Sequence, residues 1–139
     1  MSDGSQAEEM ARKLGIKKGI SMAIMNPPYG FVKSLVEIRE TLRAMHTDIR
    51  KGESPDLDMI VYFSRGRKGL EETFPRLVEQ LAPDGVLWIG WMKPKVLKVD
   101  LNEKAVREIA QKNGMEDVES MAFSDEWPML RFARAKGRK

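Results

Sequence analysis

The sequence predicts an α/β protein in three layers: a mostly parallel sheet with helices on both faces, closed by a C-terminal antiparallel hairpin. Short apolar runs alternate with segments of helical composition, which is typical of parallel sheets. Two runs, Met59–Phe63 and Val86–Met92, are almost entirely apolar, as strands buried on both faces are. The last two strand candidates are separated by five residues, a loop length that permits a hairpin.

The composition indicates one folded domain over residues 1–139, because an apolar share of 42% and a charged share of 32% suit a globular chain of this length. The chain has no cysteine and one histidine, which excludes disulfides, thiolate zinc sites and multi-histidine metal sites. We therefore predict no metal site.

No segment predicts contact with a membrane. The longest stretch without a charged side chain, residues 19–32, has 14 residues, fewer than the roughly 20 apolar residues that span a bilayer. The chain opens on polar residues rather than on an apolar export signal. We expect a cytoplasmic protein.

The positive net charge of +3 comes from the C-terminus. Residues 131–139 carry five cations and no acid, so subtracting these five from the total leaves −2 for residues 1–130. We expect a solvated basic tail over residues 135–139, with nucleic-acid binding that is weak if it occurs at all.

The first part of the chain predicts two helices around one strand. Residues 1–15 are expected to hold a short helix, Gln6–Leu14, that ends at Gly15. The apolar run Ile20–Met25 predicts a strand. Helical spacing of apolar residues predicts a helix over Phe31–Met45. Residues 46–58 are typical of a surface connection, with His46 at the surface and room for a short edge strand.

Between the two central strands, the segment Leu70–Leu81 is helical by composition. Pro75 has no backbone N–H, so it must kink this helix or start a second one. Pro83-Asp84-Gly85 predicts a turn that leads into the strand Val86–Met92.

The last part of the chain predicts a helix and then the hairpin. Asp100 and Glu103 form a capping-box pattern at the start of the helix, and Asn113-Gly114 is a stop signal. Val118–Phe123 and Met129–Arg134 are the two strands of the hairpin.

This order of elements, with the turn and strand Leu81–Ile89, resembles the second half of a Rossmann-like methyltransferase domain. More specifically, the chain resembles a bacterial family of short methyltransferase-like proteins of unknown function. The similarity covers residues 14–19, 26–31 and most of 58–134, and it is clearest from Asp100 to Phe132. The resemblance implies a truncated methyltransferase-like fold and no particular reaction.

The segment Asn26-Pro27-Pro28-Tyr29 follows a predicted strand, and amino-group methyltransferases carry a similar tetrapeptide. In those enzymes the asparagine accepts a hydrogen bond from the target amine and the aromatic ring stacks on the base. Their S-adenosylmethionine site also needs a Gly-x-Gly turn after an earlier strand, and no two glycines here have that spacing. In one interpretation, Asn26 and Tyr29 are therefore catalytic candidates. In the other, the segment is only a Pro-Pro turn by which the chain leaves the strand, without a catalytic role.

The segment Ser64-Arg65-Gly66-Arg67-Lys68-Gly69 lies between a predicted strand and a predicted helix. Backbone N–H groups at a helix start, together with three cations, suit a phosphate or a carboxylate. Ser64, Arg65 and Arg67 are therefore anion-binding candidates. The segment lacks P-loop spacing, and the other interpretation is a solvated loop in which Ser64 or a nearby group caps the helix.

Three candidate residues, Asn26, Ser64 and Lys93, lie at or just after the ends of successive strands. In a parallel sheet these ends share one edge, where ligands usually bind. Trp91 and Trp127 are further ligand-binding candidates there. The other interpretation is that these tryptophans pack in or beside the core.

The sequence therefore predicts a domain that binds a small anionic ligand or a protein partner, without catalysis and without a cofactor. The alternative is an S-adenosylmethionine-dependent amino-group methyltransferase that uses Asn26 and Tyr29. A third hypothesis is a homo-oligomer formed through an exposed sheet edge or the C-terminal hairpin.

Overall fold

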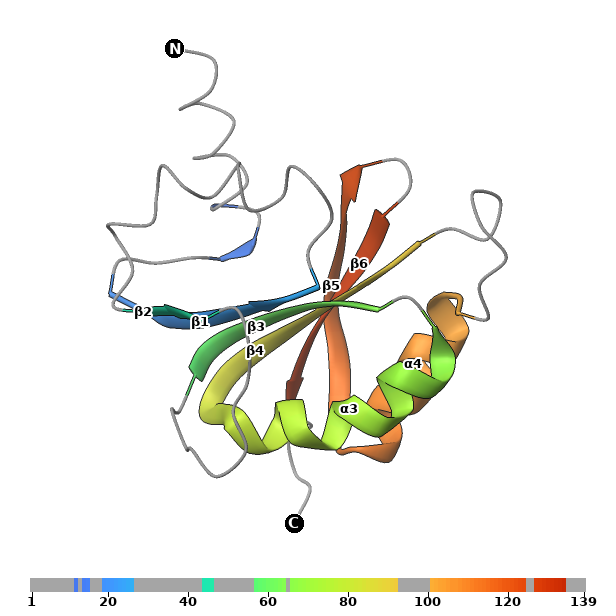
Figure 1. The fold of residues 1–139 in the computed structure, drawn as a ribbon, viewed down its shortest axis with the longest axis horizontal. Helices are drawn as coiled ribbons and strands as arrows, with labels where there is room; N and C mark the ends of the chain where they lie inside the picture. Colours follow the sequence, from blue (N-terminus) through green and yellow to red (C-terminus); the bar gives the residue numbers. More distant parts are fainter. Residues whose placement is uncertain are drawn as a thin grey trace.

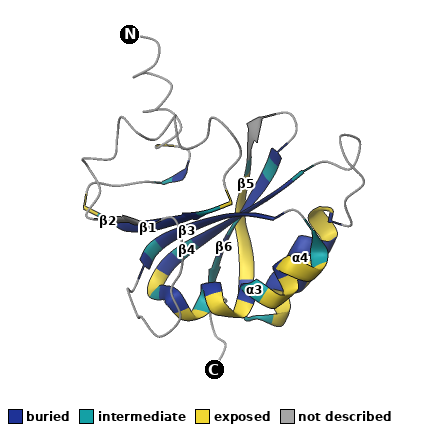
Figure 2. Ribbon diagram, viewed as in Figure 1, coloured by how far each residue is buried: buried dark blue, intermediate teal, exposed yellow. Residues whose placement is uncertain are grey.

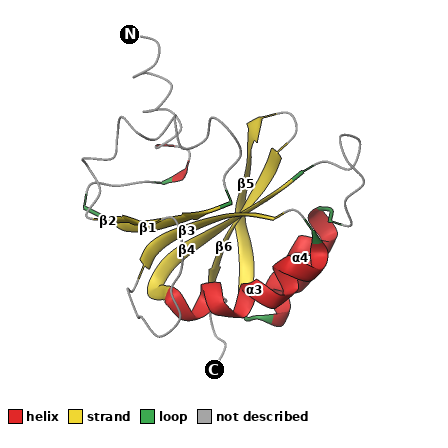
Figure 3. Ribbon diagram, viewed as in Figure 1, coloured by secondary structure: helices red, strands yellow, loops and turns green. Residues whose placement is uncertain are grey.

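The structure is a computed structural model, and it describes residues 12, 14–15, 19–26, 44–46, 57–64, 66–92, 101–124 and 127–134. Their elements follow one another along the chain as β1 (Ser21–Met25), β2 (Ala44–His46), β3 (Leu57–Ser64), α3 (Arg67–Gln80), β4 (Leu81–Trp91), α4 (Glu103–Lys112), β5 (Met115–Ser124) and β6 (Trp127–Arg134) (Figure 1, Figure 3). Neither α3 nor α4, nor any other helical part of these ranges, is long and apolar enough to cross a membrane.

The strands form one six-stranded sheet in the order β2-β1-β3-β4-β6-β5. The four strands from β2 to β4 run parallel to one another. β6 pairs antiparallel with β4, and β5 pairs antiparallel with β6 at the edge of the sheet. This arrangement confirms the predicted mostly parallel sheet with a C-terminal antiparallel hairpin.

Each face of the sheet packs into its own apolar core, because successive side chains of a strand point to opposite faces. On β3, Ile60 and Tyr62 pack with α3 and α4, while Val61 and Phe63 belong to the core of the other face. Figure 2 shows that α3 and α4 turn their buried residues toward the sheet and their exposed residues away from it. We call these the α3–α4 face and the opposite face.

The opposite face is covered in part by residues from the N-terminal segment. Arg12 and Leu14 are helical, and Leu14 is fully buried against the core of the opposite face. Gly15 follows with a φ of +86°, which agrees with the predicted helix end at this residue. The sheet therefore lies between helical residues on both faces. The rest of the predicted helix Gln6–Leu14 lies outside the described residues.

The segment between β1 and β3 differs from the prediction. Residues Ala44–His46 form β2, so a helix cannot extend to Met45, and the edge strand lies at the start of the predicted connection. β2 pairs on the outer side of β1, so β1 lies inside the sheet. The sequence did not reveal where β2 lies, because a strand of three residues is too short to show the period-2 pattern that identifies a strand.

Helix α3 is one continuous element that contains Pro75 and begins at Arg67, three residues before the predicted start. Its buried residues Leu70, Phe74 and Leu77 lie on both sides of the proline. Packing of this stripe against the sheet therefore compensates for the backbone hydrogen bond that Pro75 cannot make.

Strand β4 begins at Leu81 rather than at Val86. Leu57 pairs with Leu81 and Met59 pairs with Val86, so Pro83-Asp84-Gly85 form an irregularity inside the strand instead of a turn before it. Gly85 is buried there, and a Cβ atom on it would lie 2.9 Å from the carbonyl oxygen of Leu57. The turn residues were identified correctly, but the pairing of Leu81 with β3 extends the strand through them.

The N-cap of α4 is Asn102, not Asp100. The Oδ1 atom of Asn102 accepts a hydrogen bond from the backbone N–H of Ala105 at 2.8 Å. Asp100 lies outside the described residues. At the other end, Gly114 has a φ of +79° after Asn113, which confirms the predicted stop.

The predicted hairpin is confirmed, and both of its strands are longer than predicted. β5 and β6 are joined by two residues, and Trp127 is already part of β6.

Two cations assigned by sequence to the basic C-terminus lie within β6. Arg131 pairs with Glu119 at 3.1 Å, and Arg134 donates hydrogen bonds to the carbonyl oxygens of residues 78, 81, 82 and 83. The tail, residues 135–139, lies outside the described residues.

Candidate functional site

The parallel strands bring three of the predicted site residues to one edge of the sheet. Ser64, the last residue of β3, pairs with Trp91, the last residue of β4. Met25 at the end of β1 pairs with Tyr62, so Asn26 leaves the sheet at the same edge. Lys93 is two residues beyond β4 and lies outside the described residues.

This edge contains the point at which the order of the strands reverses. From β1 the chain goes outward to β2, and from β3 it goes in the other direction through α3 to β4. β1 and β3 are neighbours, so their carboxyl ends flank the reversal (Figure 1). In open α/β sheets, ligands bind in the crevice outside the carboxyl ends of the strands at such a switch point.

Asn26 stands at this switch point in an unusual backbone conformation. Its φ is +53°, and it is the one residue other than glycine with a positive φ in the described part of the chain. Asparagine tolerates this conformation better than most residues do, and the Asn26 side chain is exposed. Pro27, Pro28 and Tyr29, the rest of the predicted tetrapeptide, lie outside the described residues.

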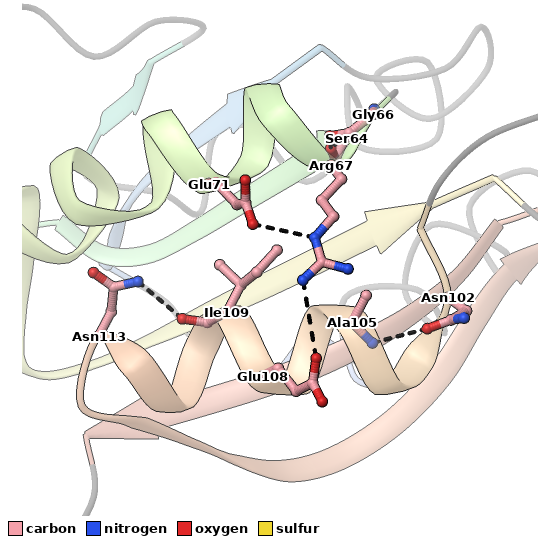
Figure 4. Close-up of polar contacts among 9 residues, drawn as sticks. All are labelled: Ser64, Gly66, Arg67, Glu71, Asn102, Ala105, Glu108, Ile109 and Asn113. Atoms are coloured by element: carbon pink, nitrogen blue, oxygen red, sulfur yellow. Dashed lines mark hydrogen bonds and ion pairs between the residues drawn. The ribbon is translucent and has the colours of Figure 1, made fainter.

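Ser64 organises the exit from β3 but does not cap α3. Its side chain is buried, and its Oγ atom donates to the carbonyl oxygen of Gly66 at 2.8 Å and accepts from the Gly66 N–H at 3.3 Å (Figure 4). Of the two capping options, Ser64 is therefore wrong, and the neighbouring Gly66 occupies the N-cap position. Ser64 lies two residues before the N-cap Gly66, whereas a capping side chain belongs to the N-cap residue itself.

The N-terminus of α3 faces the same edge. The N-cap Gly66 provides no side-chain oxygen, and the first turn contains no acidic residue. The first N–H groups of a helix have no acceptor within the helix, and this end of the helix dipole is positive. The start of α3 therefore favours an anionic group at the switch point.

The guanidinium of Arg67, the first residue of α3, is held by two carboxylates. Its Nε atom donates to Oε2 of Glu71 at 3.1 Å, and its Nη2 atom lies 3.9 Å from Oε1 of Glu108 on α4 (Figure 4). Arg65, the neighbouring anion-binding candidate, lies outside the described residues. The sequence predicted an excess of positive charge at the segment 64–69. Glu71 and Glu108, which lie outside this segment, partly offset that charge.

The two tryptophans proposed for the site lie on different faces of the sheet. Trp91 packs into the core of the α3–α4 face, and Trp127 packs into the core of the opposite face. Trp127 contacts Phe63 edge-to-face, with 5.4 Å between the ring centroids. Both side chains are at least 95% buried, and the structure does not bring them together at the switch point.

The ion pairs of Arg67 identify two residues near the site that sequence reasoning missed. Glu71 lies four residues after Arg67 in a helix, a spacing that the sequence does show. Glu108 belongs to another helix, and no local pattern links it to Arg67. Within the described residues, no group of three or more histidine or acidic side chains could hold a metal ion.

Comparisons with known proteins show the fold. No family model matches the chain, and no curated protein matches it by sequence. Among solved structures, it is similar to a chain of the Haloferax volcanii complex between the Trm112 methyltransferase activator and a methyltransferase. The TM-score is 0.67 and the sequence identity is 9%, and the match covers 96% of this chain and 90% of that one.

Two similar structures contain bound ligands. The 1,6-didemethyltoxoflavin-N1-methyltransferase of Burkholderia thailandensis, solved with 1,6-didemethyltoxoflavin and S-adenosylhomocysteine, has a TM-score of 0.65 and 9% identity over 95% of this chain and 77% of that one. The magnesium protoporphyrin IX methyltransferase of Synechocystis PCC 6803, solved with S-adenosylmethionine, has a TM-score of 0.62 and 11% identity over 95% and 80%.

The chain therefore has a Rossmann-like methyltransferase fold. Identities of 9 to 11% show this shared fold and do not carry an activity from one protein to another.

Proposed function

We propose that this protein is a non-catalytic methyltransferase-like domain that binds a small anionic ligand at the switch point between β1 and β3. The observation that carries the proposal is the reversal of strand order there, with Asn26 directly after β1 and Ser64 at the end of β3. The positive N-terminus of α3 next to Ser64 favours an anion over a neutral ligand.

The sequence after β1 supports a role without S-adenosylmethionine. In a dinucleotide-binding Rossmann fold, glycines after the first strand let the backbone approach the ligand closely. Here exposed Asn26 follows β1, two prolines come next in the sequence, and the chain has no Gly-x-Gly spacing. These residues do not fit a cofactor that needs a glycine turn at this position.

The alternative is an S-adenosylmethionine-dependent amino-group methyltransferase. Its support is the fold shared with enzymes whose structures contain S-adenosylhomocysteine or S-adenosylmethionine. In this alternative, the Asn26 carboxamide accepts a hydrogen bond from the target amine and Tyr29 stacks against the substrate.

Several finer proposals accompany the binding role. We propose membership in a bacterial family of short methyltransferase-like proteins that act in the cytoplasm. Arg65 and Lys93 are further ligand-contact proposals, because they follow the carboxyl ends of β3 and β4 in the sequence. Trp91 and Trp127 are buried in the two cores, so we propose that they support the site by packing rather than by contact with the ligand. A protein partner is a competing occupant, which the similar chain from the Trm112 complex makes reasonable. Self-association and weak nucleic-acid binding through the tail are further competing proposals.

Thermal unfolding and calorimetric titration test the binding role. The probes are AMP, adenosine, inorganic phosphate, S-adenosylmethionine and S-adenosylhomocysteine. A ligand at 100 times its Kd raises the free energy of unfolding by about 2.7 kcal/mol, which a thermal scan detects. We expect AMP or phosphate to bind, and Asn26→Ala to weaken binding of AMP. Gln111→Ala is the matched control, since Gln111 is also exposed and lies on α4.

The outcomes separate the hypotheses. Binding of S-adenosylmethionine together with transfer of a radiolabelled methyl group would support the alternative over our proposal. Failure of every probe to bind would overturn the anion-binding role and leave a protein partner as the stronger hypothesis. Light scattering over a range of protein concentrations measures self-association directly.

A further inference from the structure

Arg67 lies next to the proposed anion site, but its guanidinium faces two acids instead. Glu71 holds the Nε atom from the next turn of α3, and Glu108 approaches Nη2 from α4 (Figure 4). The three side chains are 39%, 44% and 47% exposed. The cation therefore has acidic partners in the absence of a ligand, and both of them remain in contact with water.

Ion pairs of this exposure are weak. Exposed carboxylate–guanidinium pairs contribute little to stability, because water screens the charges and the long side chains lose entropy. A phosphate at the start of α3 can accept hydrogen bonds from the guanidinium and from the first N–H groups of the helix at the same time. An anionic ligand at the start of α3 can therefore displace the carboxylates of Glu71 and Glu108 from Arg67.

We propose that Glu71 and Glu108 act as internal competitors for Arg67 and thereby set the affinity of the switch-point site for anions. This inference rests on the proposed function, and it names the residues that regulate the same site. Because Glu108 belongs to α4, the exchange also releases one contact between α4 and α3 when the ligand binds.

Titration of AMP into a set of variants tests this competition. In Glu71→Gln with Glu108→Gln, we expect AMP to bind roughly two- to fivefold more tightly, since two weak competing pairs are removed. Adenosine has no phosphate, so its affinity should not change. Glu103→Gln is the matched control, because Glu103 also forms an exposed pair with an arginine, Arg107, but does not contact Arg67.

The same substitutions made in an Arg67→Gln protein separate competition for Arg67 from a general repulsion between the acids and the anion. In Arg67→Gln, AMP should bind more weakly, and adding the two glutamine substitutions should then give no gain. If the gain is the same with and without Arg67, the acids act by general electrostatic repulsion and the inference is wrong. Unchanged AMP affinity in the double variant, with binding intact in the wild type, overturns this inference alone. Absence of AMP and phosphate binding in every protein overturns the proposed function, and the inference with it.

Discussion

The indole nitrogen of Trp88 donates a hydrogen bond to the carbonyl oxygen of Leu14, 2.9 Å away and 74 positions earlier in the chain. Trp88 lies on central strand β4, and both residues are fully buried on the opposite face. The bond attaches the N-terminal segment to the middle of the sheet. It also satisfies a carbonyl group near the end of a helix, where backbone acceptors have no partner within the helix.

Trp88→Phe should destabilise the protein by at least about 1 to 3 kcal/mol, because the Leu14 carbonyl would stay buried without a donor and the smaller ring would leave a cavity. Urea unfolding followed by circular dichroism measures the loss. Val118→Ala is the control and should change stability by less than about 0.5 kcal/mol, since Val118 is 57% exposed. Equal stabilities of the two variants would show that the indole bond contributes nothing.

Arg134→Lys should cost about 1 to 2 kcal/mol although it keeps the charge. The Arg134 guanidinium donates to the carbonyls of Val78 and Leu81 at 3.0 Å and also to those of Ala82 and Pro83. A lysine ammonium cannot span these acceptors as a planar guanidinium does. Arg76→Lys, on the exposed side of α3, is the control. An equally stable Arg134→Lys protein would contradict a role of this geometry in stability.

Two glycine substitutions should have opposite effects. Gly85→Ala should destabilise by about 1 to 3 kcal/mol, because the new Cβ would lie 2.7 Å from Cγ of Leu81 and 2.9 Å from the carbonyl oxygen of Leu57. Gly69→Ala should stabilise α3 by roughly 0.5 to 1 kcal/mol, since it adds a better helix former where no atom outside its chain neighbours and the nearby backbone of the helix lies within 4 Å. Denaturant midpoints of both variants check the two signs, and a stabilising Gly85→Ala would show that β4 has no close contact there.

Asn102→Ala should cost about 1 kcal/mol through loss of the N-cap of α4. Asn102→Ser keeps a capping oxygen and should recover most of this loss. Asp100→Ala tests the cap predicted from sequence and should leave the stability nearly unchanged. Chemical unfolding measures the free energy of unfolding of each variant. If Asp100→Ala lost more stability than Asn102→Ala, Asp100 would be the N-cap, as the sequence predicted.

Local patterns in the sequence were sufficient for the fold class and for most elements. The apolar runs around Val61 and Ile89 identified the two central strands, because a strand buried on both faces excludes polar residues over its whole length. Asn113-Gly114 marked the end of α4, because glycine adopts a positive φ without steric cost. The shared edge of Asn26 and Ser64 also followed from sequence, since the carboxyl ends of parallel strands must lie together.

Other features depended on long-range contacts that no local pattern contains. The strand Ala44–His46 exists because β1 offers it a partner, and Pro83-Asp84-Gly85 lie inside β4 because Leu81 pairs with Leu57. The face of each tryptophan depends on the register of its strand, and a shift of one residue reverses every side chain. The contact of Arg67 with Glu108 requires α3 and α4 to pack side by side on one face. Spacing along the chain therefore determined most of the elements. Tertiary pairing and packing decided the strand β2, the start of β4 and which side chains meet at the candidate site.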